Sequence, residues 1–249
     1  NAITAGQEGE WDFPITAVSA TSTGTFYFRL VTIPWNVDTA LSSYTNYPSV
    51  VIGASADLRQ IRYRFRQDTV SESTNSAWLA AEDATSTMDR GGQTRIRMEV
   101  SNEGGATSGK TRFQLQSGIA RNSGSGLGCV PVPLWSPVGA AGSTTPDWAM
   151  MPSQFLDDAA STTDFTGSLT NENTTFVGGA QKDQDGQTIY AELSSTNFTE
   201  HEFSLTTASS SINIGTTFCF RLIDGTSGTT QVFTYAQYPA TTITSSFSL

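Results

Sequence analysis

The chain has 249 residues, with 13 Lys and Arg against 23 Asp and Glu, which gives a formal net charge of −10. This acidic balance argues against nucleic acid or anionic lipid as a partner, and the absence of any apolar run of about 18 residues predicts no membrane span. The chain opens at Asn1 without an initiator Met or an apolar targeting segment. We therefore expect a leader to have been removed and the protein to be extracellular or on a cell surface.

The first 52 residues read as a flexible arm followed by three strands. Residues 1–8 are small and polar, which is typical of a mobile terminus. Strands are predicted around 11–18, 24–33 and 44–52. Three strands of this kind present an apolar face that needs a second layer. That layer must come from downstream or from another molecule.

The next strands alternate apolar residues with arginines. In Ile61–Arg66 the apolar residues take one face and the arginines the other, and Arg95–Val100 repeats the pattern. Arginines on one sheet face repel one another unless carboxylates neutralise them. Those carboxylates could belong to the same chain (Glu82, Asp83 and Glu99), to a neighbouring subunit or to an anionic polysaccharide. We favour the subunit because the chain is acidic overall. The interface candidates are Arg62, Arg64, Arg66, Arg95 and Arg97.

The rest of the chain predicts short strands between turns. A short helix is expected at 77–83, and the Gly/Ser/Asn run at 117–128 is interpreted as a domain boundary. Turn-separated strands at this spacing favour sandwiches. The sequence therefore predicts an all-β protein with two antiparallel β-sandwich domains, immunoglobulin-like or jelly-roll-like. Their predicted ranges are 1–118 and 119–249.

A segment near the end of the chain occurs twice. Thr217–Leu222 reads Thr-Phe-Cys-Phe-Arg-Leu, and Thr25–Leu30 reads Thr-Phe-Tyr-Phe-Arg-Leu, about 190 residues earlier. Neighbouring positions match at nearly the same spacing, among them Phe13 with Phe203 and Ile52 with Ile243. We interpret this as an internal repeat, in which a second copy of the unit's last 50 or so residues precedes the unit.

The two cysteines, Cys129 and Cys219, are either free buried thiols or one bridge. Cys129 follows a Gly-rich loop that could deliver it to the strand carrying Cys219, and we favour the bridge. A bridge implies an oxidising setting outside the cytoplasm. The sequons at Asn173 and Asn197 are glycosylation candidates that suit secretion, although chance matches are common in so Thr-rich a chain.

Four stretches together carry a family resemblance: Phe218–Leu222, Tyr235–Pro239, Trp78–Asp83 and Met98–Gly104. This set resembles the long tandem β repeats of uncharacterised secreted and surface proteins of bacteria, over Glu8 to Ile243. The resemblance implies that Cys219 has an upstream partner like Cys129. It also implies a cell-surface or extracellular structural role, and proteins of this kind carry no agreed enzymatic activity.

Catalytic and metal-binding patterns are poor. The single histidine, His201, is interpreted as a strand-surface residue, because no nucleophile or orienting group can be placed beside it. Carboxylate pairs such as Glu200 and Glu202 read as solvated edges, not as a glycosidase pair. Asp183 and Asp185 form a weak calcium candidate that lacks the distal Glu of an EF-hand loop, and an Asp-Gly turn is favoured. We expect no enzyme and no cofactor, with calcium as the one possibility.

The function predicted from these features is an extracellular structural subunit that self-assembles head to tail into a filament or pilus-like appendage. Similar segments at both ends favour an open head-to-tail contact, and the arm (Asn1, Ala2, Ile3 and Thr4 foremost) could donate a strand to the next subunit. The alternative is a carbohydrate-binding or adhesive module that stacks surface glycans on Trp35, Trp135 or Trp148. A glycosidase ranks below both.

Overall fold

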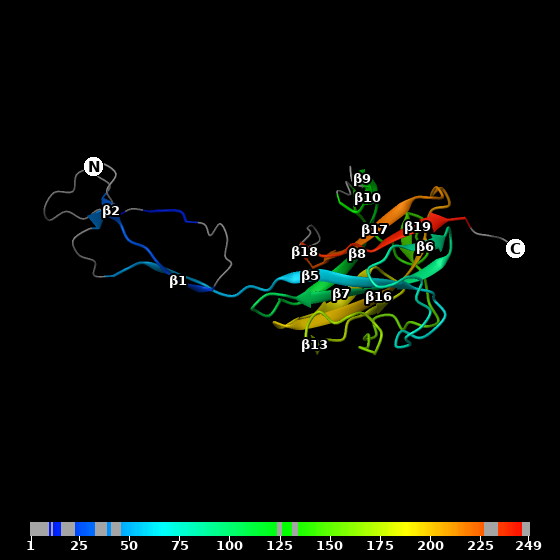
Figure 1. Cartoon of the computed structure of the whole chain (residues 1–249), viewed down its shortest axis with the longest axis horizontal. Helices are drawn as coiled ribbons and strands as arrows, with labels where there is room; N and C mark the ends of the chain where they lie inside the picture. Colours follow the sequence, from blue (N-terminus) through cyan, green and yellow to red (C-terminus); the bar gives the residue numbers. More distant parts are fainter. Residues whose placement is uncertain are drawn as a thin grey trace. The chain divides into compact units, whose positions relative to one another are not determined.

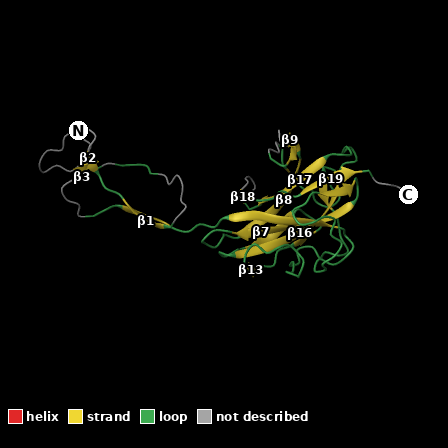
Figure 2. Ribbon diagram, in the orientation of Figure 1, coloured by secondary structure: helices red, strands yellow, loops and turns green. Residues whose placement is uncertain are grey.

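The computed structural model describes residues 10, 12–15, 23–32, 39–40, 46–123, 126–130, 134–226 and 234–245. The chain divides into two compact units, Asn1–Ala54 (unit 1) and Ser55–Leu249 (unit 2). Every regular element in the described residues is a strand (Figure 2), which confirms the all-β class. These residues contain no helix with the length and apolar character needed to cross a membrane.

Unit 1 contains a β-hairpin. Strand β1 (Gly24–Tyr27) pairs antiparallel with β4 (Ser49–Ile52), and the short β2 (Val31–Thr32) pairs with β3 (Thr39–Ala40) (Figure 1). A two-stranded hairpin is marginally stable in water unless another layer covers it. Apart from this hairpin, the described residues of unit 1 form only the two-residue pair β2–β3.

Unit 2 is a sandwich of two curled sheets. The seven-stranded sheet has three long central strands, β16, β7 and β5, all antiparallel neighbours (Figure 1). Its members are β12 (Trp148–Met150), β16 (Asn197–Thr207), β7 (Gln93–Asn102), β5 (Leu58–Arg66) and β18 (Thr234–Tyr235), with β13 (Thr175–Phe176) and β14 (Gln181–Lys182) on β16.

The second sheet has six strands, and β17 lies at its centre between β8 and β19. Its members are β11 (Ser136–Pro137), β8 (Thr111–Ile119), β17 (Thr217–Asp224), β19 (Ala240–Thr244) and β6 (Ser86–Asp89), with β15 (Gln187–Ala191) on β8.

Alternating apolar residues from both sheets meet in one core. Phe203 of β16 lies on one side, with Phe218 and Phe220 of β17 on the other, all fully buried or nearly so. The Trp148 ring packs edge-on between the sheets, with ring centroids 5.5 Å from Phe218 and 4.9 Å from Phe220. Because strand side chains alternate between faces, this single core fixes which residues of every long strand point outward.

The chain does not divide at the predicted boundary between residues 118 and 119. Both sheets of unit 2 mix strands from the two sides of that position, and β8 itself runs through it. The Gly/Ser/Asn run after β8 includes a small hairpin, β9 (Arg121–Ser123) with β10 (Gly126–Gly128), so it is not an interdomain linker. Unit 2 is one sandwich, and the division of the chain lies at Ala54.

Some local predictions also fail. The expected helix at 77–83 is an irregular loop in which Ala77 and Asp83 have positive φ angles of 62° and 58°. This left-handed geometry is incompatible with a helix interior. Strand β6 was not predicted.

The favoured disulfide is confirmed. Cys129 and Cys219 are bonded, with Cα atoms 5.6 Å apart, across 90 residues of sequence. Cys219 points away from the core side of β17 that Phe218 and Phe220 occupy, so the bond ties the segment after β10 to the outside of the six-stranded sheet. A disulfide is compatible with an extracellular location.

Candidate functional site

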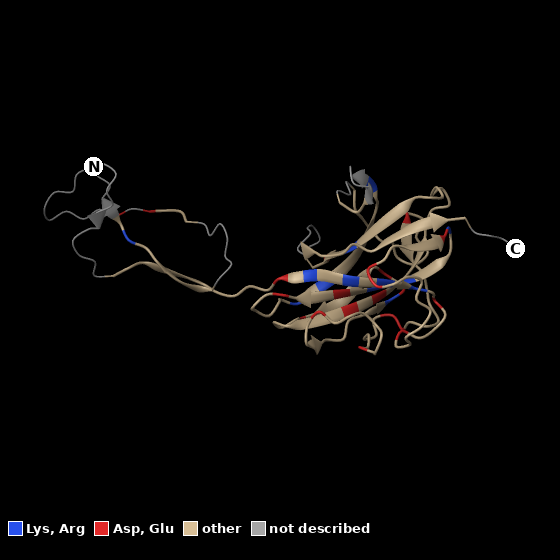
Figure 3. Cartoon of the chain, in the orientation of Figure 1, with Lys and Arg blue, Asp and Glu red and all other residues tan. Residues whose placement is uncertain are grey.

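Arginines and carboxylates gather on the outer face of the seven-stranded sheet. Figure 3 shows blue bands along β5 and red bands along β16, with β7 between these two strands. Arg66, Arg95 and Arg97 are fully buried there, as are Glu200 and Glu202. Segments from the loops after β5 and after β12 provide the cover, since Glu72, Thr163 and Ser168 contact this face.

Arg97 lies at the centre of this buried charge cluster. Its Nε donates to Glu200 Oε2, and its Nη1 lies 2.9 Å from Glu72 Oε2 and 3.0 Å from Glu202 Oε2. Burial lowers the pKa of the guanidinium, but the two strand carboxylates outweigh it and hold the pKa of Arg97 above its usual range. Arg97 therefore stays charged and binds two strands and one loop together.

The two neighbouring arginines hold the same loop. Arg66 donates to the carbonyl oxygens of Glu72 and Thr74, at 2.9 and 2.7 Å. Arg95 donates to the Val70 carbonyl at 2.6 Å, and its Nε lies 3.2 Å from Glu202 Oε1. These guanidinium groups serve as fixed donors to a loop backbone that the sheet cannot pair.

The arginine face is therefore not a free docking surface at its buried end. The prediction that neighbouring subunits neutralise this face is wrong for Arg66, Arg95 and Arg97. These three arginines form salt bridges with Glu202 of the same chain, which is the alternative that had not been favoured. Arg62 is half-buried and paired with Glu82, Asp83 and Glu172, while Arg64 stacks on Trp78 at 4.5 Å. The other predicted interface residues, Asn1, Ala2, Ile3 and Thr4, lie outside the described residues.

Glu99 is a buried carboxyl of this face, and the charge of Arg62 only partly offsets the effect of its burial. Burial raises the pKa of Glu99 to about 8, an N–H from Glu172 opposes that rise, and the nearby Glu200 adds to it. Glu99 and Glu200 are directly opposite each other on β7 and β16. A shared proton or a neutral Glu99 relieves the repulsion between them, so this pair reads as a buried structural feature and not as an acid and base in a cleft.

His201 is not a surface residue. It is fully buried, its ring lies 4.8 Å from that of Phe113, and its Nδ1 accepts the backbone N–H of Ala180 at 2.9 Å. Burial, with a smaller contribution from Arg97, lowers the pKa of His201 to about 3. Among the described residues His201 Nε2 has no hydrogen-bond partner, so the structure pairs this histidine with no nucleophile there.

At the predicted calcium site, the ammonium group of Lys182 pairs with the carboxylates of Asp158 and Asp185. Lys182 Nζ lies 3.0 Å from Asp158 Oδ1 and 3.4 Å from Asp185 Oδ1, while Asp183 Oδ2 accepts the Ser153 N–H. The described residues contain no group of three or more His, Cys, Asp or Glu side chains arranged to hold a metal ion. The Asp183 and Asp185 loop is therefore closed by an ion pair.

The two sequons differ in their side-chain contacts. Asn173 Nδ2 donates to Ser101 Oγ at 2.6 Å and to Glu103 Oε1 at 2.9 Å. A glycan on that nitrogen would replace one of its two hydrogens, so at least one of these bonds would be lost. Asn197 is half-buried at the start of β16, with its backbone N–H bonded to the Ser194 carbonyl.

The structure describes two of the three tryptophans predicted as stacking platforms for glycans, Trp135 and Trp148. Trp148 lies in the core, and Trp35 lies outside the described residues. Trp135 is half-buried and already packs against two neighbours, Arg221 at 4.4 Å and the Tyr238 ring at 5.9 Å. A ring engaged in this way offers little open face to a sugar.

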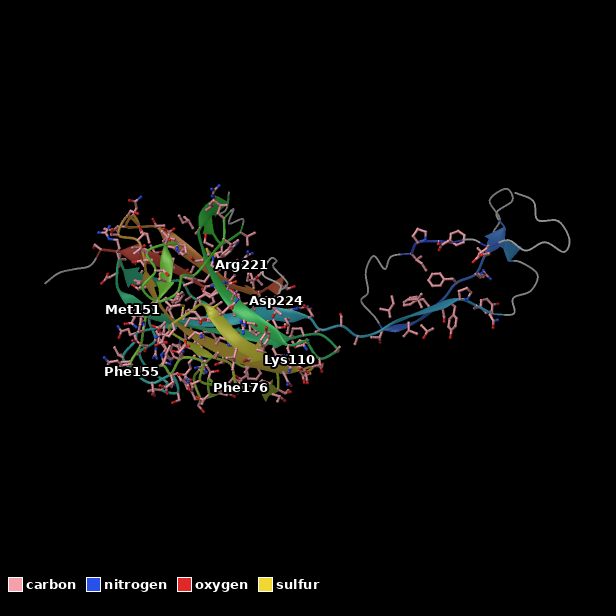
Figure 4. The ribbon with its side chains drawn as sticks, turned by 180° about the vertical axis from the view of Figure 1, so that it is seen from behind. Lys110, Met151, Phe155, Phe176, Arg221 and Asp224 are labelled. Carbon is pink, nitrogen blue, oxygen red and sulfur yellow. A yellow bond between two sulfur atoms is a disulfide. The ribbon has the colours of Figure 1, made fainter. Side chains whose placement is uncertain are left out.

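The hairpin of unit 1 exposes large apolar side chains to solvent. Phe26 is exposed by 46%, Tyr27 by 70%, Val51 by 73% and Val50 by 44%. Figure 4 shows the described side chains along this hairpin. A contiguous apolar surface of this kind marks an interaction site.

Comparison with known proteins gives no guide. No protein-family model, curated protein or solved structure matches the chain.

The candidate site is therefore the apolar hairpin of unit 1, which we call the open hairpin (Gly24–Tyr27 with Ser49–Ile52). The sequence located these strands and their need for cover. It did not show that Glu72, Glu200 and Glu202 neutralise the arginine face, because these carboxylates come from distant segments.

Proposed function

We propose that this chain is an extracellular structural subunit that joins its neighbours through the open hairpin, in a head-to-tail filament or surface array. The observation that carries the proposal is the exposed apolar row formed by Phe26 and its cross-strand partner Val50 on one face of the hairpin, with Tyr27 and Val51 exposed on the other face. Burying such a row stabilises an interface by about 25 cal/mol per Å² of apolar surface.

Three further features support a structural role. The buried charge cluster and the disulfide hold unit 2 rigid. The candidate catalytic groups are engaged in the fold, with His201 neutral in the core and Glu200 bonded to Arg97. The resemblance to tandem β repeats of bacterial surface proteins points the same way.

The test is sedimentation velocity on the pure chain over a series of concentrations, with electron microscopy of native material. We expect concentration-dependent association and uniform filaments or arrays, because the open hairpin removes its apolar row from water. Phe26→Ser should return the chain to monomers. The matched control is Ile119→Ser, which removes a similarly exposed apolar residue (49%) from unit 2 and should leave association unchanged.

Two outcomes would contradict the proposal. Dispersed monomers at the highest concentration reached would remove assembly as the function. Equal loss of association in the Phe26 and Ile119 variants would show that the open hairpin is not the contact. A glycan array would then be the next measurement, with Trp135 as the residue to replace.

A further inference from the structure

The open hairpin and the β17–β19 pair of unit 2 have the same register. In unit 1, Thr25, Phe26 and Tyr27 pair with Val51, Val50 and Ser49. In unit 2, the matching residues Thr217, Phe218 and Cys219 pair with Thr242, Thr241 and Ala240. Each residue of one pairing has its counterpart in the other at the sequence spacing of the repeat.

A hydrogen bond beyond the paired strands is also shared. The Phe28 N–H donates to the Pro48 carbonyl at 2.8 Å, and the Phe220 N–H donates to the Pro239 carbonyl at 2.9 Å. A slip of one residue would turn every side chain to the opposite face. The agreement therefore fixes the faces as well: Phe26 and Phe28 correspond to Phe218 and Phe220.

The surroundings of the two hairpins differ completely. Phe218 and Phe220 are 1% and 0% exposed, whereas Phe26 and Phe28 are 46% and 38% exposed. In unit 2, β8 pairs with the edge of β17 that faces away from β19, and β6 pairs with β19. The rings of Trp148 and Phe65 pack on Phe220, on the inner face of the pair. Unit 2 thus shows what a hairpin of this register and pattern fits against.

We infer that the open hairpin completes the sandwich of a second polypeptide, in the way that the β17–β19 pair completes unit 2. This partner resembles residues 55–208 and lacks a β17–β19 pair of its own, and we call it the second body. This inference rests on the proposed function and names the partner of its site. The partner supplies a β8-like strand to the edge of β1 and an apolar sheet to Phe26 and Phe28.

An intact second copy can bury the apolar face of the open hairpin in a surface contact, as in the proposed assembly, but it cannot close the hairpin as β8, β6 and Trp148 close the β17–β19 pair. Its body already holds β17 and β19, with Phe218, Phe220 and Ile243 buried and Cys219 bonded to Cys129. An incoming hairpin would have to displace one that is tethered in the same chain and therefore present at high effective concentration. Each copy also has two such hairpins and one body, so exchange among intact copies always leaves hairpins uncovered.

The disulfide provides a specific test of the match. Tyr27 stands where β17 has Cys219, so Tyr27→Cys should place a thiol beside Cys129 of the second body. The test chain carries residues 55–208 joined ahead of Ala17, which keeps the spacing that unit 2 has between β16 and β17. The whole of unit 2 remains in the chain as an internal folded control.

We expect the added body to fold onto the open hairpin. Tyr27→Cys should then leave no free thiol, and peptide mapping should find the new cysteine bonded to the added copy of Cys129. The matched control is Arg29→Cys, about 7 Å further along the strand, which is too far for a disulfide and should leave both thiols free. The test chain should also no longer self-associate as the original chain does, because the added body covers its open hairpin.

The outcomes separate the two proposals. An added body that stays sensitive to protease, or that bonds equally to cysteines at positions 27 and 29, overturns the inference, even where the free chain still assembles through Phe26. A free chain that never associates overturns the proposed function, even where the added body folds.

Discussion

Arg97 Nη1 lies 3.0 Å from Glu202 Oε2, and the two residues are directly opposite each other on β7 and β16, with both side chains fully buried. Removing one partner of a buried pair leaves the other charge uncompensated. We expect Arg97→Met to lower the free energy of unfolding by about 3–5 kcal/mol, measured by urea denaturation.

The control for this prediction is Arg62→Met on the same sheet face. Arg62 is half-exposed in its contacts with Glu82 and Asp83, so its loss should cost less than about 1 kcal/mol. Equal effects of the two substitutions would show that the buried charge cluster does not hold the loops as described.

Glu99 should make the protein less stable as the pH rises. Its pKa is about 8 in the fold, above the ordinary 4.5, so the folded state holds a proton that the unfolded state releases. The stability from this group is complete below about pH 4.5 and is lost as the pH rises through 8. Glu99→Gln keeps an oxygen for the Glu172 N–H and should exceed the parent stability at pH 8–9 by on the order of 1–3 kcal/mol.

Urea denaturation of both proteins from pH 5 to 9 measures this difference. Glu192→Gln, at an exposed position, is the control and should follow the parent curve. Parallel curves for the parent and the Glu99 variant would mean that Glu99 is ionised in the fold.

The sequence predicted strands where one residue in two is apolar, and failed where that signal is weak. β7 has Ile96, Met98 and Val100 at alternate positions and β5 ends in a similar run, whereas β6 has Met88 as its one large apolar residue. The arginine face was located correctly on its strands. Its burial was missed because Glu200 is 103 residues from Arg97, and a strand pattern does not show which loop covers a face.

The sequence predicted that the strands of the candidate site lack a covering layer, but it did not predict where unit 1 ends. The repeat pointed to the first 52 residues as incomplete, since three strands need a second layer. The division at Ala54 was not found, because the Gly/Ser/Asn run after β8 has the composition of a linker and yet includes a hairpin within unit 2. Local composition does not reveal that strands on both sides of that run share two sheets.

His201 should make the protein sensitive to acid. Its pKa is about 3 in the fold and 6.5 in a model compound, so the unfolded state binds a proton first as the pH falls. Stability from the neutral ring is present above about pH 6.5 and is lost as the pH falls toward 3. His201→Leu should flatten this part of the curve, and should cost about 1–3 kcal/mol at pH 8 because the Ala180 N–H loses its acceptor.

Guanidinium chloride denaturation between pH 4 and 8 tests both parts of this prediction. An acid slope that is the same in the Leu variant would assign the proton uptake to other groups.

The disulfide should contribute to the stability of unit 2. It closes a segment of 90 residues, and the loss of such a cross-link costs about 2–5 kcal/mol. Thermal unfolding with and without reductant measures the effect. The double variant Cys129→Ala with Cys219→Ala should match the reduced parent and should not respond to reductant. A parent that is equally stable when reduced would contradict the prediction.

Gly179 allows a loop to approach β16 closely. A Cβ atom at this position would lie 1.9 Å from the Glu200 carbonyl oxygen and 2.9 Å from His201 Nδ1. Neither neighbour can move away without disturbing the centre of the seven-stranded sheet, since Glu200 and His201 pair with Glu99 and Met98. We expect Gly179→Ala to lower the free energy of unfolding by about 3 kcal/mol or more, at the upper end of overpacking effects.

The matched control is Gly109→Ala, where a Cβ atom would meet nothing within 4 Å. That substitution should change stability by less than about 0.5 kcal/mol or raise it slightly, because alanine restricts the unfolded chain. Both variants can be compared by urea denaturation at one pH. A Gly179 variant as stable as the Gly109 variant would mean that the loop can retreat from β16, and that the cover over Glu200 is not rigid.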